Sequence, residues 1–266
     1  MSLAETHTDK QLVRQDRGNG IIELTLNRPK AFNALSSDLM SELSAALSEC
    51  ADNPQDRVII LAGSGPGFCA GHDLKEVRDL PDLVARERLM AQCSDLMMQV
   101  VYSPKPIIAK VQGIATAAGC QLVASCDLAV ADNNARFGTP GVNIGLFCHT
   151  PMVALSRNVS RKHAMEMLLT GEMIGAEDAL RFGLINRHAA AAELDASALD
   201  FAEKIASKSA YTVRIGKQAF YKQLDSDLRG AYDYASKVMV ENMMAHDAKE
   251  GIGAFIEKRQ PKWQDR

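Results

Sequence analysis

Two segments in which small residues follow an apolar run have the composition of loops that present backbone amides to a ligand. The first, at residues 58–74, reads VIILAGSGPGFCAGHDL. Its Gly63 and Gly65 have the spacing of a dinucleotide-binding loop, but Phe68 stands where the third glycine belongs. No Gly-Lys-Ser/Thr ending follows that would make it an NTPase phosphate loop. We therefore predict an irregular, tightly packed turn whose amides face another kind of ligand.

The second segment, at residues 113–119, reads GIATAAG and lies between the apolar run PIIAKVQ and a short helical pattern. Amides at the start of a helix carry the positive end of its dipole and point at an anion placed there. If the amides after Gly71 and before Gly119 converge, they form a two-donor oxyanion site for a carbonyl that becomes an enolate or a tetrahedral anion. The alternative interpretation is that both segments are only tight turns.

Strand and helix patterns alternate through the first half of the chain, and these elements must position the two loops. Alternation of this kind indicates an α/β fold with parallel pairing, in which loops at strand ends carry the chemistry. We expect a β-hairpin from the runs at 11–18 and 20–28, helices at 37–50, 83–101 and 117–127, and buried strands at 57–63, 106–113 and 128–132.

The last third of the chain changes character, because its pattern is almost entirely helical from Arg161 onward. We expect this helical region to be broken at Gly171, Gly183 and Gly216, and to end with a helix through GIGAFIEKR. The change predicts a helical part that packs on the core or on another subunit.

Composition excludes several classes of protein. The formal net charge of -3 argues against a nucleic-acid partner, which needs a basic surface. No apolar run approaches the roughly 18 residues of a membrane span, and the start, MSLAETHTDK, is polar rather than a signal peptide, so we predict no membrane partner and a cytoplasmic location. The six cysteines form no Cys-x-x-Cys pair, so we predict buried thiols and no metal site.

Six stretches of sequence are informative when taken together. They are NRPK and NAL at 27–35, FCAGHDL at 68–74, AGCQL at 118–122, FGTP at 137–140, LLTGEMIGAEDALRFGLIN at 168–186 and EGIGAFIEKR at 250–259. These motifs resemble the enoyl-CoA hydratase/isomerase family, also called the crotonase family, over nearly the whole chain.

The resemblance implies an α/β spiral of ββα turns with a helical C-terminal trimerisation region, an acyl-CoA or enoyl-CoA thioester as ligand, and a homotrimer or a dimer of trimers. It implies no cofactor beyond the coenzyme A moiety of the substrate. On this basis we divide the chain into a core with the thioester site at 1–195 and a helical oligomerisation region at 196–266.

The same resemblance implies the residues that hold the thioester. The amides of His72 and Ala118 would be the oxyanion donors, and the backbone from Ala70 to Leu74 would read the adenine. Asp73 within that loop would also contact coenzyme A, and Arg28 and Lys30 would bind its phosphates. Phe255 and Lys258 lie three residues apart on a predicted helix, and the resemblance implies that they contact the coenzyme A of a neighbouring subunit.

The chain departs from the hydratase pattern at two positions. Hydratases of the family use two glutamates, and Gln121 and Gly141 stand where they belong. Glutamine cannot exchange a proton at neutral pH, and glycine offers only backbone. Hydration by the two-glutamate route is therefore expected to be lost or very slow, whereas an oxyanion site can still support enolate chemistry.

His149, just beyond the second missing glutamate, is our candidate general base, because histidine titrates near neutral pH and related isomerases carry an acidic residue there. The alternative is an ordinary loop histidine. The side chain of His72 is a weaker candidate, and Asp73 is expected to close a turn or to cap the following helix. Two functions follow: a thioester enzyme that acts through an enolate, or an acyl-CoA-binding protein that has lost catalysis.

Overall fold

The computed structural model describes residues 10–266. The polar segment MSLAETHTDK, on which the prediction of no signal peptide rested, therefore lies largely outside the described residues. The main sheet has six strands, and only its first pair, the predicted hairpin, is antiparallel. In spatial order the strands are β1 (Leu12–Asp16), β2 (Ile21–Leu26), β3 (Val58–Gly63), β4 (Ile107–Val111), β6 (Leu128–Asp132) and β9 (Arg187–Ala189).

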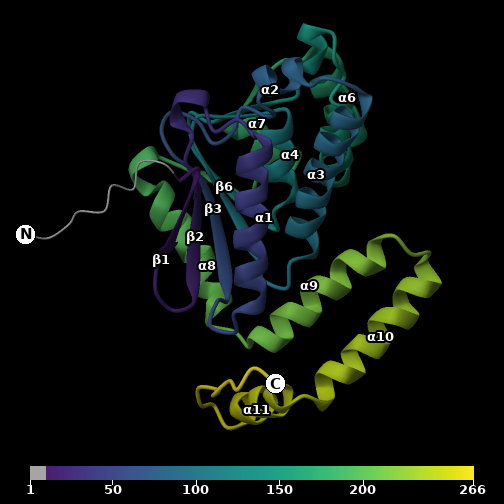
Figure 1. Cartoon of the computed structure of the whole chain (residues 1–266). Helices are drawn as coiled ribbons and strands as arrows, with labels where there is room; N and C mark the ends of the chain where they lie inside the picture. Colours follow the sequence, from purple (N-terminus) through teal and green to yellow (C-terminus); the bar gives the residue numbers. More distant parts are fainter. Residues whose placement is uncertain (1–9) are drawn as a thin grey trace, which may run out of the picture.

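The main sheet is covered on both faces, which explains why its central strands are apolar throughout. Ile59 and Leu61 of β3 belong to the larger core with helices α1 (Ser37–Asp52) and α3 (Leu83–Tyr102). Val58 and Ile60 belong to a second cluster with α8 (Leu194–Ala206). In Figure 1 α1 and α8 accordingly lie on opposite sides of the strands.

A smaller sheet positions the site. Its strands are β5 (Ile114–Thr116), β7 (Arg136–Gly138) and β8 (Ile174–Gly175). Two single parallel bridges extend it, one from Cys69 to Ala115 and one from His72 to Leu35. The FCAGHDL loop therefore runs as an irregular strand beside β5.

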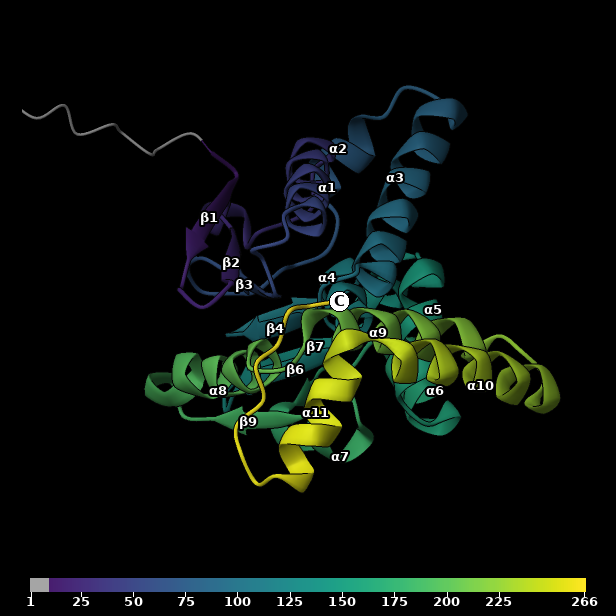
Figure 2. The same cartoon turned by 90° about the horizontal axis from the view of Figure 1, so that it is seen from below.

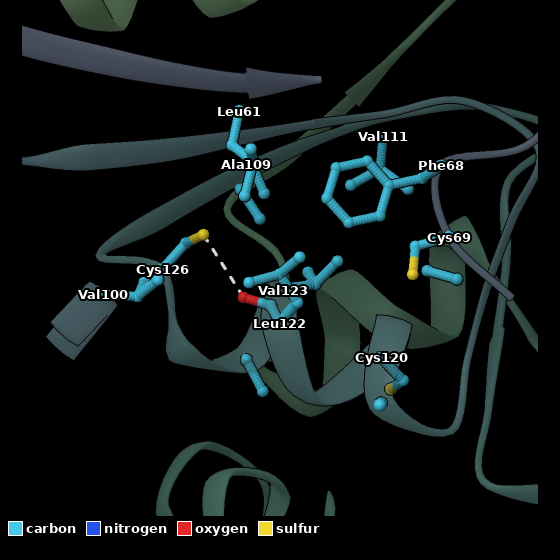
Figure 3. Packing of buried hydrophobic residues seen from close by; sticks show 14 of the residues in the cluster. Leu61, Phe68, Cys69, Val100, Ala109, Val111, Cys120, Leu122, Val123 and Cys126 are labelled. Atoms are coloured by element: carbon cyan, nitrogen blue, oxygen red, sulfur yellow. Dashed lines mark hydrogen bonds between the residues drawn. The ribbon is translucent and has the colours of Figure 1, made fainter. Parts of the chain in front are cut away.

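Helix α4 (Ala118–Ser125) follows β5 and is buried along its whole length. Figure 3 shows Leu122 and Val123 of α4 beneath Leu61 and Ala109 of the main sheet, and the thiol of Cys126 donating a hydrogen bond to the Leu122 carbonyl at 3.3 Å. Because α4 is held from all sides, its first residues are fixed relative to the loop beside β5.

The remaining helices are mostly peripheral. They are α2 (Leu74–Asp79), α5 (His149–Asn158), α6 (Arg161–Thr170), α7 (Ala176–Phe182), α9 (Ala210–Leu224), α10 (Leu228–Met244) and α11 (His246–Ile256), with short 3-10 turns at Pro29–Ala31, Pro140–Ile144 and Ala191–Glu193. Figures 1 and 2 show α10 and α11 extending away from the sheets.

Buried polar contacts join α9 to the body. The ammonium group of Lys217 donates to the Asp127 carboxylate at 2.7 Å and to the Val100 and Lys105 carbonyls, while the Tyr221 hydroxyl donates to the same carboxylate at 3.1 Å. The side chain of Lys217 is only 6% exposed. The attachment of the helical C-terminal part therefore depends on a charge pair shielded from water.

The α/β spiral fold expected from the sequence is confirmed, as are the hairpin and the predicted buried strands and helices of the first half. Gly171 and Gly183 end α6 and α7 in the left-handed conformation, as predicted. The predicted break at Gly216 is wrong, since α9 runs through this residue. A β-carbon at Gly216 would have open space around it, so no close contact requires glycine there. The short strands β8 and β9 interrupt the region predicted to be helical, since each pairs with a strand distant in the sequence.

Three further features bear on the sequence predictions. The predicted boundary between 195 and 196 falls at the start of α8, whose inner face packs on the main sheet, so the division into two parts stays a prediction. All six cysteines are buried free thiols, as predicted. No helix within residues 10–266 is long and apolar enough to span a membrane.

Candidate functional site

A mainly apolar cavity of about 470 Å³ opens where the two predicted amide loops meet. It lies between the FCAGHDL loop, the start of α4 and the segment that leads into α5. Its lining comprises Ala70, His72, Leu74, Val77, Met90, Thr116, Ala117, Ala118, Pro140, Gly141, Asn143, Ile144, Leu146, Phe147, Cys148, His149, Thr150 and Pro151.

The amides of His72 and Ala118 lie at the same edge of the smaller sheet, each three residues beyond the paired residues Cys69 and Ala115. The flanking groups of His72 are used: the Gly71 carbonyl accepts from the Leu35 amide, and the Asp73 amide donates to the Leu35 carbonyl. Since successive amides of an extended strand point to opposite sides, the His72 amide points away from Leu35. Within residues 10–266 neither the His72 nor the Ala118 amide donates a hydrogen bond.

The turn before α4 is strained in a way that aims the Ala118 amide. Ala117 has φ 49° and ψ -119°, a conformation that costs a non-glycine residue free energy. Its amide donates to the Gly138 carbonyl at 2.9 Å, which holds the strained residue in place. A β-carbon on Gly71 would lie 3.3 Å from the Ala118 nitrogen, so the two loops are in direct contact. Such strain is typical of functional turns.

His72 is one of the residues that line the cavity. The Nε2 atom of its imidazole is buried and has no hydrogen-bond partner within the described part of the chain. Burial lowers the pKa of this imidazole, against a smaller opposing effect of the nearby Glu76 carboxylate. The ring nitrogen is therefore enclosed by the protein, and its surroundings favour the neutral imidazole.

His149 is the first residue of α5 and is exposed; it lines the cavity, and its ring lies 5.1 Å from the ring of Phe147. Gly141 also lines the cavity, in the 3-10 turn Pro140–Ile144. A β-carbon at Gly141 would lie 2.5 Å from the Leu146 carbonyl oxygen and 2.9 Å from the Cys148 sulfur. This turn is therefore packed for glycine, and a larger residue would have to displace the 146–148 backbone.

Gln121 is not among the residues that line the cavity. It is buried in α4, 5% exposed, and its Oε1 has no hydrogen-bond partner within residues 10–266. The sequence placed Gln121 and Gly141 together as the substituted glutamate positions. The structure brings only Gly141 to the cavity wall.

Arg28 and Asp73 form an ion pair beside the loop. The guanidinium donates to the Asp73 carboxylate at 2.8 Å and also to the Ala34 carbonyl. This hydrogen bond lowers the pKa of Asp73, which caps α2 as predicted by accepting from the Lys75 amide. Arg28 is thus partly committed within the chain, whereas Lys30 is exposed and has no ion-pair partner in the part of the chain described.

The sequence analysis predicted that Phe255 and Lys258 lie on one helix, and the structure contradicts this. Helix α11 ends at Ile256, and Lys258 stands in the following turn with φ 55°. Phe255 is 85% exposed, and neither residue lines the cavity. In Figure 1 α11 lies at the bottom of the view and α2, which begins next to His72, near the top. The pair therefore lies away from the cavity of its own chain. The prediction that it contacts the coenzyme A of a neighbouring subunit stays a prediction.

Sequence reasoning missed the polar wall formed by Asn143 and Thr150, which also line the cavity. One signal was present: Pro151 follows Thr150 directly, and proline in a first helical turn marks where α5 begins. Within residues 10–266, no group of three or more His, Cys, Asp or Glu side chains is placed to hold a metal ion.

Comparison with known proteins identifies relatives along almost the whole chain. A family model described as enoyl-CoA hydratase/isomerase matches residues 16–266. The mitochondrial enoyl-CoA hydratase domain-containing protein 3 of Mus musculus is 46% identical over 260 residues, which cover 98% of this chain and 87% of the relative. A short-chain-enoyl-CoA hydratase of Clostridium acetobutylicum is 34% identical, covering 89% of this chain and 91% of that protein.

Solved structures agree with these matches. An enoyl-CoA hydratase from Mycobacterium smegmatis superposes with a TM-score of 0.94 at 49% identity, covering 96% of this chain and 99% of that one. Human enoyl-coenzyme A hydratase domain-containing protein 3 superposes with a TM-score of 0.93 at 46% identity, covering 96% of this chain and all of that one, 100%.

The names of these relatives contradict the cytoplasmic location predicted from the sequence, because several relatives at 46 to 47% identity are named mitochondrial proteins. The prediction was wrong because it rested on bulk polarity, whereas a cellular address is read by receptors. The fold and the matched length lead to one assignment: the chain belongs to the enoyl-CoA hydratase/isomerase family.

Proposed function

We propose that this protein is an enzyme that binds an acyl-CoA or enoyl-CoA thioester in the cavity and stabilises an enolate of its carbonyl group. The observation that carries the proposal is that the amides of His72 and Ala118, two residues that line the cavity, donate no hydrogen bond within the described residues. Preorganised donors of this kind are worth most where negative charge develops in a site that excludes water. Family membership supports the choice of a CoA thioester.

Proton transfer in this proposal does not follow the two-glutamate route. Gln121 stands off the cavity and Gly141 has no side chain to offer. His149 lines the cavity and is our candidate general base, since an imidazole exchanges protons near neutral pH. With an enoyl thioester, His149 would accept a proton from the water whose oxygen adds to the β-carbon, and the electron pair of the double bond would form an enolate whose oxygen faces the two amides. Return of that proton to the α-carbon would then complete the hydration and leave the imidazole neutral.

The coenzyme A part would extend from the cavity over residues 70–74 toward Lys30 and Arg28. Exposed residues on the C-terminal helices support the accompanying proposal of a homotrimer or a dimer of trimers, in which Phe255 and Lys258 meet a neighbour's coenzyme A. Large exposed apolar patches mark interaction sites. The apolar side chains include Phe220, Leu224, Leu228, Tyr232, Met239, Val240, Met243, Met244, Ile252, Phe255 and Ile256. Light scattering should give a mass three or six times that of the 28.9 kDa chain.

Turnover of crotonyl-CoA, followed as loss of the enoyl-thioester absorbance, tests the proposal. We expect measurable turnover that falls about 100-fold or more in His149→Ala, because a general base contributes on that scale. His188→Ala is the matched control, since His188 is exposed on β9 and bonds Asn133 rather than lining the cavity. If His149→Ala turns over crotonyl-CoA like the wild type, His149 is not the base.

The replaced glutamates favour a second candidate, an acyl-CoA-binding protein without catalysis. The same preparation distinguishes the two. A binding protein would show no turnover of any thioester but would gain thermal stability when coenzyme A thioesters are added, because a ligand that binds only the folded state raises the melting temperature. Absence of both turnover and stabilisation would contradict both candidates.

A further inference from the structure

A second cavity, of about 520 Å³, lies at the opposite end of the main sheet from the proposed thioester cavity. Arg57 and Pro106, which directly precede β3 and β4, line it, whereas the proposed thioester cavity is lined by segments that follow these strands. In Figure 1 this is the lower end of the sheet, where α9 begins. The two cavities share no lining residue, and strands of this length span roughly 17–20 Å. The second cavity is therefore a separate site.

Positive charge is concentrated in this second cavity, the basic cavity. The carboxylates of Asp52 and Asp265 line it together with four cations, which are Arg57, Lys105, Lys208 and Arg214. The Asp265 carboxylate is already paired with Arg57, at 2.7 Å. The chain as a whole carries a formal net charge of -3. The excess of cations is therefore a local feature of the basic cavity.

Three of these four cations have no anionic partner within residues 10–266. The guanidinium of Arg57 is committed, because it donates to two backbone carbonyls and to the Asp265 carboxylate. Lys105, Lys208 and Arg214, by contrast, form no ion pair in the described part of the chain. They come from two remote segments, the loop before β4 and the start of the C-terminal helices. The fold thus brings three unneutralised charges to one cavity.

Lys105 is the most enclosed of the three. Its ammonium group is partly buried and donates one hydrogen bond within the described residues, to a backbone carbonyl at 3.1 Å. Burial lowers the pKa of Lys105. The guanidinium groups of Arg214 and Arg57 lower this pKa further, against the opposing effect of the Asp56 carboxylate. Repulsion between neighbouring cations costs free energy, and a bound anion would remove that cost.

The basic cavity also has ring-shaped walls, which suit an organic ligand better than a bare ion. The centre of the Tyr211 ring lies 5.5 Å from the guanidinium carbon of Arg214, and Pro54, Pro104 and Pro106 add apolar surface. A guanidinium forms paired hydrogen bonds with a phosphate group, and an ammonium binds phosphate as a point charge. Flat bases stack on aromatic side chains. Cations without partners beside an aromatic ring therefore suit a nucleotide.

We propose that the basic cavity binds a nucleoside diphosphate, whose phosphates contact Lys105, Lys208 and Arg214 and whose base lies beside Tyr211. The phosphates neutralise the three cations. They also join the start of α9, which carries Arg214, to the loop before β4, which carries Lys105. The nucleotide therefore stabilises the attachment of the C-terminal helices to the body of the protein. This second ligand is independent of the proposed thioester reaction.

Calorimetric titration of the intact protein with ADP tests the inference. We expect ADP to bind the wild type, and Arg214→Gln and Lys208→Gln each to weaken that binding about tenfold or more, the scale of one charge-assisted hydrogen bond. Both residues are exposed, so both variants should fold normally. Lys237→Gln is the matched control, because Lys237 is exposed on α10 and does not line the basic cavity. ADP should also raise the melting temperature of the wild type.

ADP resembles a part of coenzyme A, so a further variant separates the two sites. Lys30→Gln, altered at the proposed coenzyme A site, should keep the wild-type affinity for ADP. Loss of binding in Lys30→Gln alone would place ADP in the coenzyme A site and overturn the inference. The inference also fails if ADP does not bind the wild type, or binds Arg214→Gln and Lys208→Gln as tightly as the wild type. Inorganic pyrophosphate that bound as tightly as ADP would contradict the assignment of a nucleotide.

Discussion

A β-carbon placed on Gly119 would lie 2.1 Å from the carbonyl oxygen of Cys69. The second residue of α4 therefore touches the backbone of the FCAGHDL loop directly, with no room for any side chain. This contact sets how closely the Ala118 amide approaches the His72 amide. The oxyanion geometry proposed above thus depends on a glycine that takes no part in chemistry.

Gly119→Ala should lower the free energy of unfolding by about 1–3 kcal/mol, the usual cost of overpacking a close contact. It should also weaken thioester binding, because the two loops must separate. Urea denaturation and calorimetry would measure both effects. Gly216→Ala is the matched control: it lies in an exposed part of α9 with open space around it, so we expect a gain of about 0.5–1 kcal/mol. Unchanged stability and binding in Gly119→Ala would show that the loops are not in contact.

Ala118→Pro should remove one oxyanion donor and leave the helix intact. Ala118 is the first residue of α4, a position where proline is well tolerated. Loss of one such donor typically lowers kcat by about 100- to 1,000-fold. We expect that loss on the best thioester substrate, together with a lower melting temperature, because proline also restricts the strained residue Ala117 before it. Turnover like that of the wild type would remove the Ala118 amide from the mechanism.

The Arg28–Asp73 pair should make stability depend on pH. Its hydrogen bond lowers the pKa of Asp73 in the folded protein, so the pair stabilises the fold above the unfolded-state value of about 3.9. That contribution is lost as the pH falls through the lower folded-state pKa. Asp73→Asn keeps a capping side chain and removes the charge, so it should cost about 1 kcal/mol at pH 7 and almost nothing once the pH lies below the folded-state pKa of Asp73. The urea midpoints of the wild type and Asp73→Asn, measured from pH 7 downward, test the sign of this pH dependence. A stability difference between the two proteins that grew at low pH would contradict it.

Lys217→Met should destabilise the protein strongly. It would leave the Asp127 carboxylate, which is largely buried, without its cationic partner, and breaking a buried pair costs about 3–5 kcal/mol. Tyr221→Phe removes one hydrogen bond from the same carboxylate and should cost only about 1 kcal/mol. Urea denaturation gives the free energy of unfolding of each variant. Equal losses in the two variants would contradict the dominant role of the Lys217–Asp127 charge pair.

Placing glutamates at residues 121 and 141, where the family resemblance implies them, should not create an ordinary active site. In Gln121→Glu the new carboxyl would be buried, and burial raises a carboxyl pKa. A raised folded-state pKa means that the variant approaches wild-type stability below the unfolded value of about 4.3 and loses stability as the pH rises above it. Urea midpoints from pH 4 to pH 8 would show a growing deficit.

Gly141→Glu should fail for a different reason, because its β-carbon would meet the Leu146 carbonyl at 2.5 Å. We expect a loss of about 1–3 kcal/mol at every pH and no gain in crotonyl-CoA hydration. Gly145→Ala is a control for backbone strain in the same loop. Gly145 has a positive φ, which strains any side chain, but the space around it is open. Hydration that rises about tenfold or more in Gly141→Glu would show that the 146–148 backbone yields easily.

The sequence by itself determined the strands and helices of the first half of the chain and the positions of the two loops rich in small residues. Apolar strands, cap residues such as Ser36 and glycines such as Gly171 act through local periodicity and backbone freedom, which are properties of adjacent residues. The motif spacing also determined the family. These parts could be predicted because no contact between remote segments was needed.

Only the tertiary structure decided what faces the cavity. Gln121 and Gly141 were equivalent in sequence, yet α4 packs the first into the interior and the loop before α5 places the second on the wall. Arg28 was assigned to phosphate binding from the sequence, and the fold pairs its guanidinium with the Asp73 carboxylate. The physical reason is that the direction of a side chain depends on the register between strands and on burial against segments far away in the chain, and neither is written in local spacing.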